Sequence, residues 1–427
     1  MSKRILFKHA RLLDPASRMD RPGDLLVEGE AIAGFGTLED ATADQVIDCV
    51  GKALMPGLVD MRVQIREPGE EHKENLVSAA HAAAAGGITS LATLPNTQPV
   101  IDDQSLVEFI AREARKIGLV KIFPYAAATR GLQGKELTEM GLLAGVGAVG
   151  FTDGVKAIAN AQVMRLALSY ARTFDQLIVQ HAEEPSLAND AGMNECEWAT
   201  RLGLPGIPAA AEVIMVERDL RLLELSGSRL HFAHVSTADS IDAIRKAKIR
   251  GLRVTCDTAP PYFTLNETAV GDYRTFAKLS PPLRGEADRL AVLNGIADGT
   301  IDAIASDHSP HDQDSKRLPF AQAESGAVGL ETLLALTLAP VHQNKLDLLT
   351  ALAALTCGPA NILGLKLGQL KEGWPADLAL VDIDRPWRIE ASKFKSKSKN
   401  SPFDTLPVQG RALRTMVNGK TIFELDS

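Results

Sequence analysis

The chain has 427 residues, a formal net charge of -8 and 23% charged residues. This length fits one large α/β barrel with a small added domain, and it allows a substantial buried core. The acidic balance and the lack of an extended arginine-rich stripe argue against nucleic acid or an anionic membrane surface as a partner. The four cysteines are far apart and form no C-x-x-C motif, so neither a disulfide framework nor a cysteine zinc site is indicated.

The N-terminal sequence, MSKRILFKHARLLDP, lacks the long apolar core and small-residue cleavage site of a signal peptide. No apolar run reaches the roughly 18 residues that a membrane-spanning helix needs. We therefore expect a cytoplasmic protein.

Both ends of the chain alternate apolar and polar residues in the way that is typical of strands. Near the start these segments are ILFKHARLL and DLLVEGEAIAGFG, and near the end they are ADLALVDID and LRTMVNGKTIFEL. The last segment contains Asn418-Gly419, a strong hairpin signal. This pattern predicts one small β domain built from residues 1–55 and 365–427.

Between the two ends, apolar runs alternate with helix-like segments, which favours parallel strands joined by crossover helices. One such helix is expected at 103–116, between acidic candidate caps and Gly118. We therefore predict an α/β fold, a (β/α)8 barrel of the TIM type, over residues 56–364. The eight expected strands are 58–65, 88–94, 120–127, 148–153, 176–182, 230–236, 253–258 and 301–306.

The carboxyl ends of barrel strands form the active site in folds of this kind. A single histidine there is more often structural than functional. The interpretation changes when four potential ligands follow separate strands, because imidazole nitrogen and carboxylate oxygen are what zinc binds in open catalytic sites. The polar residues predicted at these ends are Arg62, Gln64, Arg66, Asn96, Asp153, His181, His234, Asp307, His308 and His311, and the candidate metal ligands among them are Asp153, His181, His234 and Asp307.

Several segments resemble, in order and spacing, the signature segments of dihydroorotases in the cyclic amidohydrolase superfamily. They are PGLVDMRVQIREPG, TLPNTQPVIDD, GFTDG, HVST, SPPLRGEADR and IASDHSPHDQDSKRLPF. The resemblance covers nearly the whole chain. It implies a (β/α)8 barrel with up to two divalent metals, usually zinc. It also implies the reversible ring closure of N-carbamoyl-aspartate to dihydroorotate in pyrimidine biosynthesis.

The resemblance also assigns roles to individual residues. Asp153 is similar to the carboxylate that bridges the metals, His181 and His234 to the histidines of the second metal, and Asp307 to the catalytic aspartate. Residues similar to those that hold the substrate's carboxylate are Arg66, Asn96 and His311. The family's first-strand His-x-His is replaced by Arg62 and Gln64, and a usual asparagine before PPLR is replaced by Ser280.

These replacements change what the site can bind. Arginine has no lone pair to offer a metal, and the amide oxygen of Gln64 is a poor zinc ligand. We expect the first metal position to be empty, with the guanidinium of Arg62 holding Asp153 or Asp307 in its place. The site then holds one zinc ion rather than two, or none. With one ion, Asp307 is expected to act as the general base.

Two other functions are compatible with the sequence. The chain could be a non-catalytic dihydroorotase-like subunit that supports aspartate transcarbamoylase, because some relatives without the first-strand histidines are thought to do this. Retention of the other site residues argues for an enzyme. A hydantoinase or allantoinase is the third alternative, and the carboxylate-binding residues argue against it. A small-molecule substrate and a homo-oligomer are expected in either enzymatic case.

Overall fold

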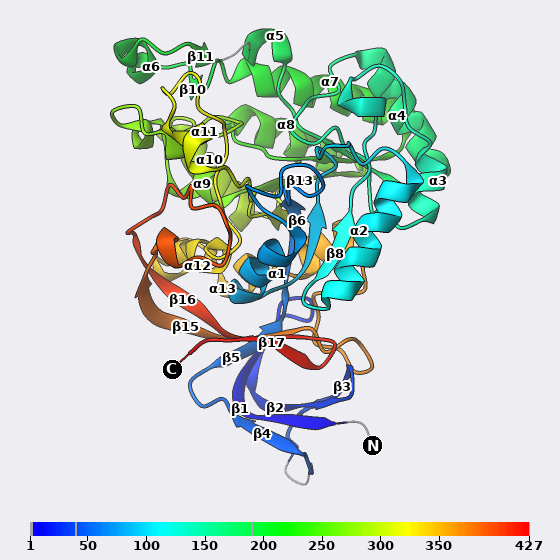
Figure 1. The fold of residues 1–427 in the computed structure, drawn as a ribbon, viewed down its shortest axis with the longest axis vertical. Coiled ribbons are helices and arrows are strands. Elements are labelled where there is room, and N and C mark those ends of the chain that lie inside the picture. The colour runs from blue at the N-terminus through cyan, green and yellow to red at the C-terminus, as the bar shows by residue number, and fades with distance from the viewer. Residues whose placement is uncertain (1–2, 39–40, 189–190, 427) are drawn as a thin grey trace.

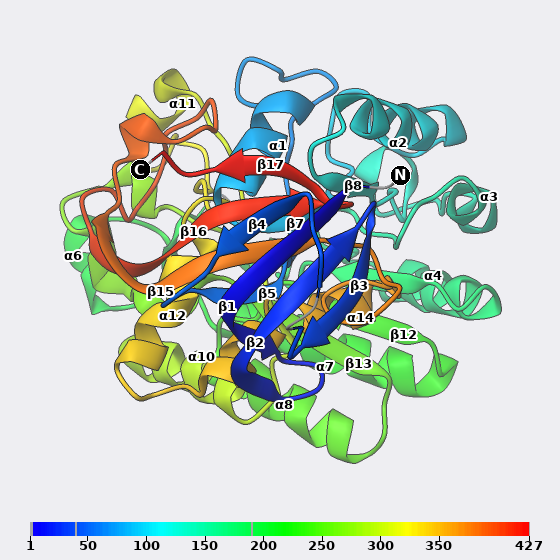
Figure 2. The ribbon, with the colours of Figure 1, turned by 90° about the horizontal axis from the view of Figure 1, so that it is seen from below.

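The computed structural model describes residues 3–38, 41–188 and 191–426. Within these ranges, the strand pairings of the middle of the chain form a ring of parallel strands. Helices surround these strands (Figures 1 and 2). The regular strands of the ring are β6 (Leu58–Val63), β7 (Ile88–Thr93), β8 (Lys121–Pro124), β9 (Leu177–Gln180), β12 (Arg229–Phe232), β13 (Val254–Thr258) and β14 (Ala303–Ile304).

Isolated bridges complete this ring. The expected strand at 148–153 is reduced to Phe151, which forms parallel bridges with Ala126 on one side and Ile178 on the other. A parallel bridge between Val63 and His308 joins β6 to the segment that follows β14. The predicted (β/α)8 barrel is therefore confirmed, with its fourth strand shortened to a single bridging residue.

Helices pack around the outside of the strands. The helix expected at 103–116 is α2 (Gln104–Ile117), which begins after the capping side chain of Asp103 and ends at Gly118, whose φ is 65°. The other longer helices are α1 (Leu76–Ala85), α4 (Ala161–Thr173), α7 (Ala210–Ser226), α8 (Ala238–Ile249), α10 (Glu286–Ala297) and α12 (Leu333–His342). Shorter elements are α3 (Met140–Gly145), α5 (Pro185–Ala188), α6 (Glu197–Leu202), α9 (Pro260–Thr264), α11 (Gln313–Arg317), α13 (Leu348–Ala353), α14 (Cys357–Ile362), β10 (Met193–Asn194) and β11 (Gly206–Ile207).

The two ends of the chain share one sheet below the barrel, as the alternating patterns predict (Figure 1). Its order is β17-β16-β15-β5-β1-β2-β3, and β4 pairs with β1. The turn between β16 and β17 is the predicted Asn418-Gly419 hairpin, where φ is 46° and 70°. The strands are β1 (Arg4–Asp14), β2 (Met19–Glu28), β3 (Ala31–Gly36), β4 (Gln45–Asp48), β5 (Ala53–Pro56), β15 (Leu378–Arg388), β16 (Pro407–Val417) and β17 (Lys420–Glu424). The exact domain limits at 55 and 364 stay a prediction.

The core has separate parts that hold the barrel and the terminal sheet in place. Every residue of β6 and β7 is buried, as expected for parallel strands covered on both faces. Inside the ring, Met61, Leu94 and Tyr125 belong to one buried hydrophobic cluster. A separate buried cluster, which includes Phe7 and Leu54, forms the core of the terminal β domain. The packed ring fixes where each strand ends, so the polar residues that follow the strands meet at one end of the barrel.

None of the helices in the described ranges has both the length and the apolar character required to cross a membrane.

Candidate active site

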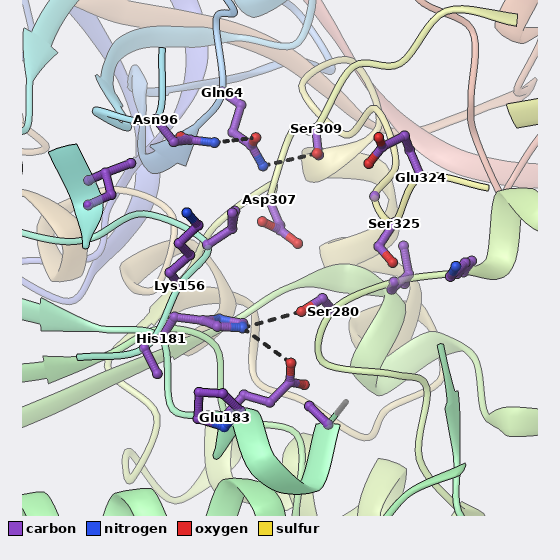
Figure 3. Close-up of a pocket in the computed structure, with 18 of the residues that line it drawn as sticks. Gln64, Asn96, Lys156, His181, Glu183, Ser280, Asp307, Ser309, Glu324 and Ser325 are labelled. Atoms are coloured by element: carbon purple, nitrogen blue, oxygen red, sulfur yellow. Dashed lines mark hydrogen bonds and ion pairs between the residues drawn. The ribbon is translucent and has the colours of Figure 1, made fainter. Parts of the chain in front are cut away.

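A cavity of about 1330 Å³ opens among the loops that follow the barrel strands. Its wall includes Asn96, His181, Asp307 and His311, which come from different parts of the chain. Figure 3 shows Asp307 between two groups of polar side chains, one around Gln64 and Asn96 and the other around His181. The barrel thus brings most of the sequence-predicted site residues to one cavity. Arg62, Asp153 and His234 are buried and do not line the cavity.

Asp307 is the carboxylate at the centre of the site. Its Oδ1 lies 2.9 Å from Nε2 of His234, and Nδ1 of the same imidazole lies 2.7 Å from Oδ1 of Asp257. Burial acts to lower the pKa of His234, but the two carboxylates outweigh it and raise that pKa to about 9. Burial acts to raise the pKa of Asp307, but His234 and then Arg62 lower it overall. Both shifts favour an ionised Asp307 beside a protonated His234.

Arg62 adds a second positive charge behind Asp307. Its side chain is 2% exposed, and its Nε lies 3.4 Å from Oδ1 of Asp307. One terminal nitrogen donates to the carbonyl of Gly154 at 3.2 Å. The expectation that Arg62 holds one of the site carboxylates is met at Asp307. A guanidinium here neutralises negative charge that a cation would otherwise balance.

The remaining predicted metal ligands have their own protein partners. Asp153 accepts hydrogen bonds from the main chain and the hydroxyl of Thr129, at 2.9 and 2.5 Å. Nε2 of His181 lies 3.2 Å from Oγ of Ser280, and burial followed by the charge of Arg62 lowers the pKa of His181 to about 3. In the described part of the chain, no three His, Cys, Asp or Glu side chains are grouped so that they could hold a metal ion.

Gln64 joins two strand ends by hydrogen bonds. Its amide nitrogen donates to Oγ of Ser309 at 2.9 Å, and its amide oxygen accepts from Nδ2 of Asn96 at 3.0 Å (Figure 3). Gln64 is thus a bridge between two side chains. It orients Asn96 toward the cavity that both residues line.

The cationic side of the cavity is formed by the guanidinium of Arg66, with the imidazole of His311 beside it. Their side-chain nitrogens lie 3.2 Å apart, and Arg66 also contacts Ser309 at 3.3 Å and Glu70 at 3.4 Å. Burial and then the charge of Arg66 lower the pKa of His311 to about 3, so its imidazole is neutral. Arg66 and Asp307 both have a positive φ, of 68° and 49°. Such strained backbone is concentrated at functional sites.

Several residues of the site were not identified from the sequence. Asp257, at the end of β13, fixes His234, and Ser309 links Gln64 with Arg66. Glu183 lines the cavity beside His181, at 3.9 Å, and burial raises its pKa. The position of Asp257 near the carboxyl end of a predicted strand could have identified it as a site residue. The sequence did not show where the His308 side chain points. In the structure it is fully buried, its Nε2 lies 3.4 Å from Oε2 of Glu74, and it does not line the cavity.

Comparisons with known proteins agree with this arrangement. A family model described as "Dihydro-orotase-like" matches residues 51–240. The dihydroorotase of Geotalea daltonii is 45% identical over 423 residues, which cover 99% of this chain and 100% of that protein. The dihydroorotase of a Wolbachia species is 44% identical over 99% of this chain and 96% of its own length.

Solved structures show the same fold. The L-hydantoinase of Arthrobacter aurescens superimposes with a TM-score of 0.88 at 27% identity and covers 99% of this chain and 96% of its own. A dihydropyrimidinase from Brevibacillus agri superimposes with a TM-score of 0.86 at 21% identity, over 99% of this chain and 95% of its own. The fold and site thus define a barrel hydrolase of the cyclic amidohydrolase class. Within this class, the chain belongs to the dihydroorotase family.

Proposed function

We propose that this protein is a dihydroorotase, which interconverts N-carbamoyl-aspartate and dihydroorotate in pyrimidine biosynthesis. The observation that carries the proposal is that the carboxylate of Asp307 and the guanidinium of Arg66, with His311 beside it, line the same cavity. Full-length identity of 45% to a protein named dihydroorotase supports it.

The proposed chemistry at Asp307 is proton transfer. In hydrolysis, the oxygen of water bonds to the carbonyl carbon of the ring amide, the bond from that carbon to nitrogen breaks, and the nitrogen gains a proton. Asp307 accepts the proton of the water and returns it to the departing nitrogen. His234 keeps Asp307 ionised and fixes its direction, and Asp257 in turn fixes His234. Ring closure follows the same path in reverse.

The cationic side suits a substrate that carries a carboxylate. A guanidinium binds a carboxylate through charge-assisted hydrogen bonds, so Arg66 is proposed as its main partner. Asn96 and His311 are proposed to fix the carboxylate's orientation from either side. Arg66 also contacts Glu70, which Lys73 holds at 2.5 Å, so a bound carboxylate would share this guanidinium with Glu70.

The residues do not fit a metal ion as they are placed. Both imidazole nitrogens of His234 face carboxylates, and both oxygens of Asp153 accept from Thr129. Arg62 places a positive charge at Asp307. The sequence left two alternatives, a site with one zinc ion and a site without zinc. The placement of these side chains favours the site without zinc, and we derive no step through a metal.

A second candidate function is a non-catalytic subunit that supports aspartate transcarbamoylase. The ion pair of Arg62 with Asp307 favours it, because the pair neutralises the site carboxylate without a metal. Identity to proteins named dihydroorotase favours the enzyme. The transcarbamoylase partner and a homo-oligomer both stay predictions. The test is whether transcarbamoylase activity or assembly requires this chain when the two proteins are purified together.

Turnover of three cyclic amides by the purified chain separates the enzymatic alternatives. We expect ring opening of dihydroorotate, and at least about tenfold lower kcat/KM for hydantoin and allantoin, because Arg66 would then lack its carboxylate. Preference for hydantoin over dihydroorotate would favour a hydantoinase instead, as the fold of the Arthrobacter protein would allow.

A further inference from the structure

One wall of the cavity is a segment without helix or strand, residues 319–326. Ala321, Ala323, Glu324, Ser325 and Gly326 line the cavity. Figure 3 shows Glu324 and Ser325 on the same side of the cavity as Ser309, with Asp307 at the centre. Because the segment is irregular, its main-chain carbonyls need partners other than a helix or sheet.

Two buried lysines supply these partners. Nζ of Lys278 donates to the carbonyls of Ala321 and Ala323, at 3.0 and 2.7 Å. Nζ of Lys316 donates to the carbonyls of Glu324 and Gly326, at 2.6 and 3.1 Å. The two lysines are 6% and 2% exposed. Burying an ammonium is costly unless it is fully hydrogen-bonded, so these contacts fix both the lysines and the segment.

The wall also contacts the carboxylate-binding side of the cavity. The carbonyl of Ser325 lies 2.9 Å from Nε2 of His311. The amide of Gly326 donates to the carbonyl of Lys278 at 2.9 Å. A Cβ at Gly326, where φ is 129°, would lie only 2.6 Å from Cβ of Ser309, so the wall approaches Ser309 as closely as a glycine allows. A shift of this wall would therefore move His311.

We propose that Lys278 and Lys316 are positioning residues for the reaction, which hold the segment 319–326 so that His311 and the cavity wall fit the substrate. This inference rests on the proposed dihydroorotase function and adds two residues to it. Lys278 also lines the cavity, but its Nζ donates to the carbonyls of Ala321 and Ala323. Both lysines act through the four carbonyls and, beyond them, through the contact of Ser325 with His311.

The test compares Lys278→Met and Lys316→Met in the full chain with a matched control, Lys248→Met. Lys248 also donates to a main-chain carbonyl, that of Thr300 at 2.7 Å, but it lies outside the cavity wall. Hydrogen exchange of peptides that cover 319–326 reports the wall, and steady-state kinetics with dihydroorotate report the reaction.

Loss of the lysine contacts should let the segment open more often, and its hydrogen-bonded amides, such as Ala323 to Pro319 and Gly326 to Lys278, should then exchange about tenfold faster in both lysine variants. KM should rise about tenfold with kcat changed less than about threefold, and Lys248→Met should alter neither quantity. Unchanged exchange would overturn the inference. Faster exchange with an unchanged KM would also overturn it, since the lysines would then be structural only.

The same experiment separates this inference from the proposed function. A wild-type chain without turnover would contradict the dihydroorotase proposal. In that case, exchange measured with and without dihydroorotate decides the inference. If dihydroorotate slows hydrogen exchange of residues 319–326 in the wild type but not in Lys316→Met, the result would support the inference that Lys316 positions the wall for the ligand. Absence of such protection would overturn it.

Discussion

Nε of Arg62 lies 3.4 Å from Oδ1 of Asp307. The guanidinium is 2% exposed and the Asp307 side chain 13%, so the pair is largely buried. Replacing Arg62 by Met should leave Asp307 with only His234 to balance its charge. We expect the free energy of unfolding to fall by roughly 3–5 kcal/mol, the usual cost of breaking a buried ion pair from one side.

Urea denaturation measures this change, and Arg245→Met is its control. Arg245 pairs with Asp298 at 2.8 Å, but both side chains are 37–45% exposed. Loss of this surface pair should cost less than about 1 kcal/mol. An Arg62→Met variant as stable as the Arg245 variant would show that Arg62 does not support the site.

The second prediction concerns metal binding. Wild-type protein should contain well under one equivalent of zinc, because the potential ligands are paired with protein groups and Arg62 repels a cation. The double variant Arg62→His with Gln64→His places two imidazoles at the carboxyl end of β6, one within the strand and one just beyond it, and removes the guanidinium. We expect it to take up zinc.

Elemental analysis after dialysis against zinc, followed by removal of loosely bound metal, checks this prediction. Gln64→His alone serves as the control, because it keeps Arg62. One full equivalent in the wild-type chain that disappears in His181→Ala would contradict the placement seen here, and would support the single-ion alternative.

The third prediction concerns substrate binding. Arg66→Met should raise KM for dihydroorotate by roughly 10- to 100-fold, because a charge-assisted hydrogen bond contributes about 1.5–3 kcal/mol. Lys135, exposed at the rim of the same cavity, provides the control. Lys135→Met removes a positive charge but should change KM by less than about threefold. Equal effects of the two variants would indicate general attraction rather than specific binding by Arg66.

The fourth prediction concerns pH and lies outside the site. Burial raises the pKa of Glu331 to about 7 despite hydrogen bonds from the main chain of Ser396 and Lys395 and the charge of Lys399. The folded chain therefore binds this proton more tightly than the unfolded chain does. The resulting stability is fully present below the ordinary pKa of about 4.5 and is lost as pH rises toward 7.

Denaturation of the wild type and of Glu331→Gln between pH 4.5 and 7.5 tests this sign. Each unit of pKa difference corresponds to about 1.4 kcal/mol, so the wild type should lose more stability across this range than the variant. Parallel curves for the two proteins would contradict a raised pKa at Glu331.

The sequence predicted the barrel well because its strands are buried on both faces and bounded by clear turn signals. The same reasoning located the ends of these strands, so it placed Asp307, His181 and Asn96 at one cavity. It also anticipated that Arg62 would hold a carboxylate. These successes depend on local pattern together with one rule about where barrel sites lie.

What the sequence could not predict is the direction of side chains among their neighbours. Asp153 was expected to face a metal with His181, but its oxygens face Thr129. Asp257 was not considered, because its role appears only when β12 and β13 pair and place it beside His234. Lys316 follows the last barrel strand like many surface lysines, and only tertiary packing buries it.

The most direct test of the central claim is the rate of dihydroorotate ring opening and N-carbamoyl-aspartate ring closure by the wild type and Asp307→Asn. The amide keeps the shape of the side chain and removes its ability to accept a proton. We expect measurable turnover in both directions, with kcat reduced by roughly 10²- to 10⁴-fold in the variant. Wild-type turnover no faster than that of Asp307→Asn would contradict the dihydroorotase proposal and favour the non-catalytic subunit.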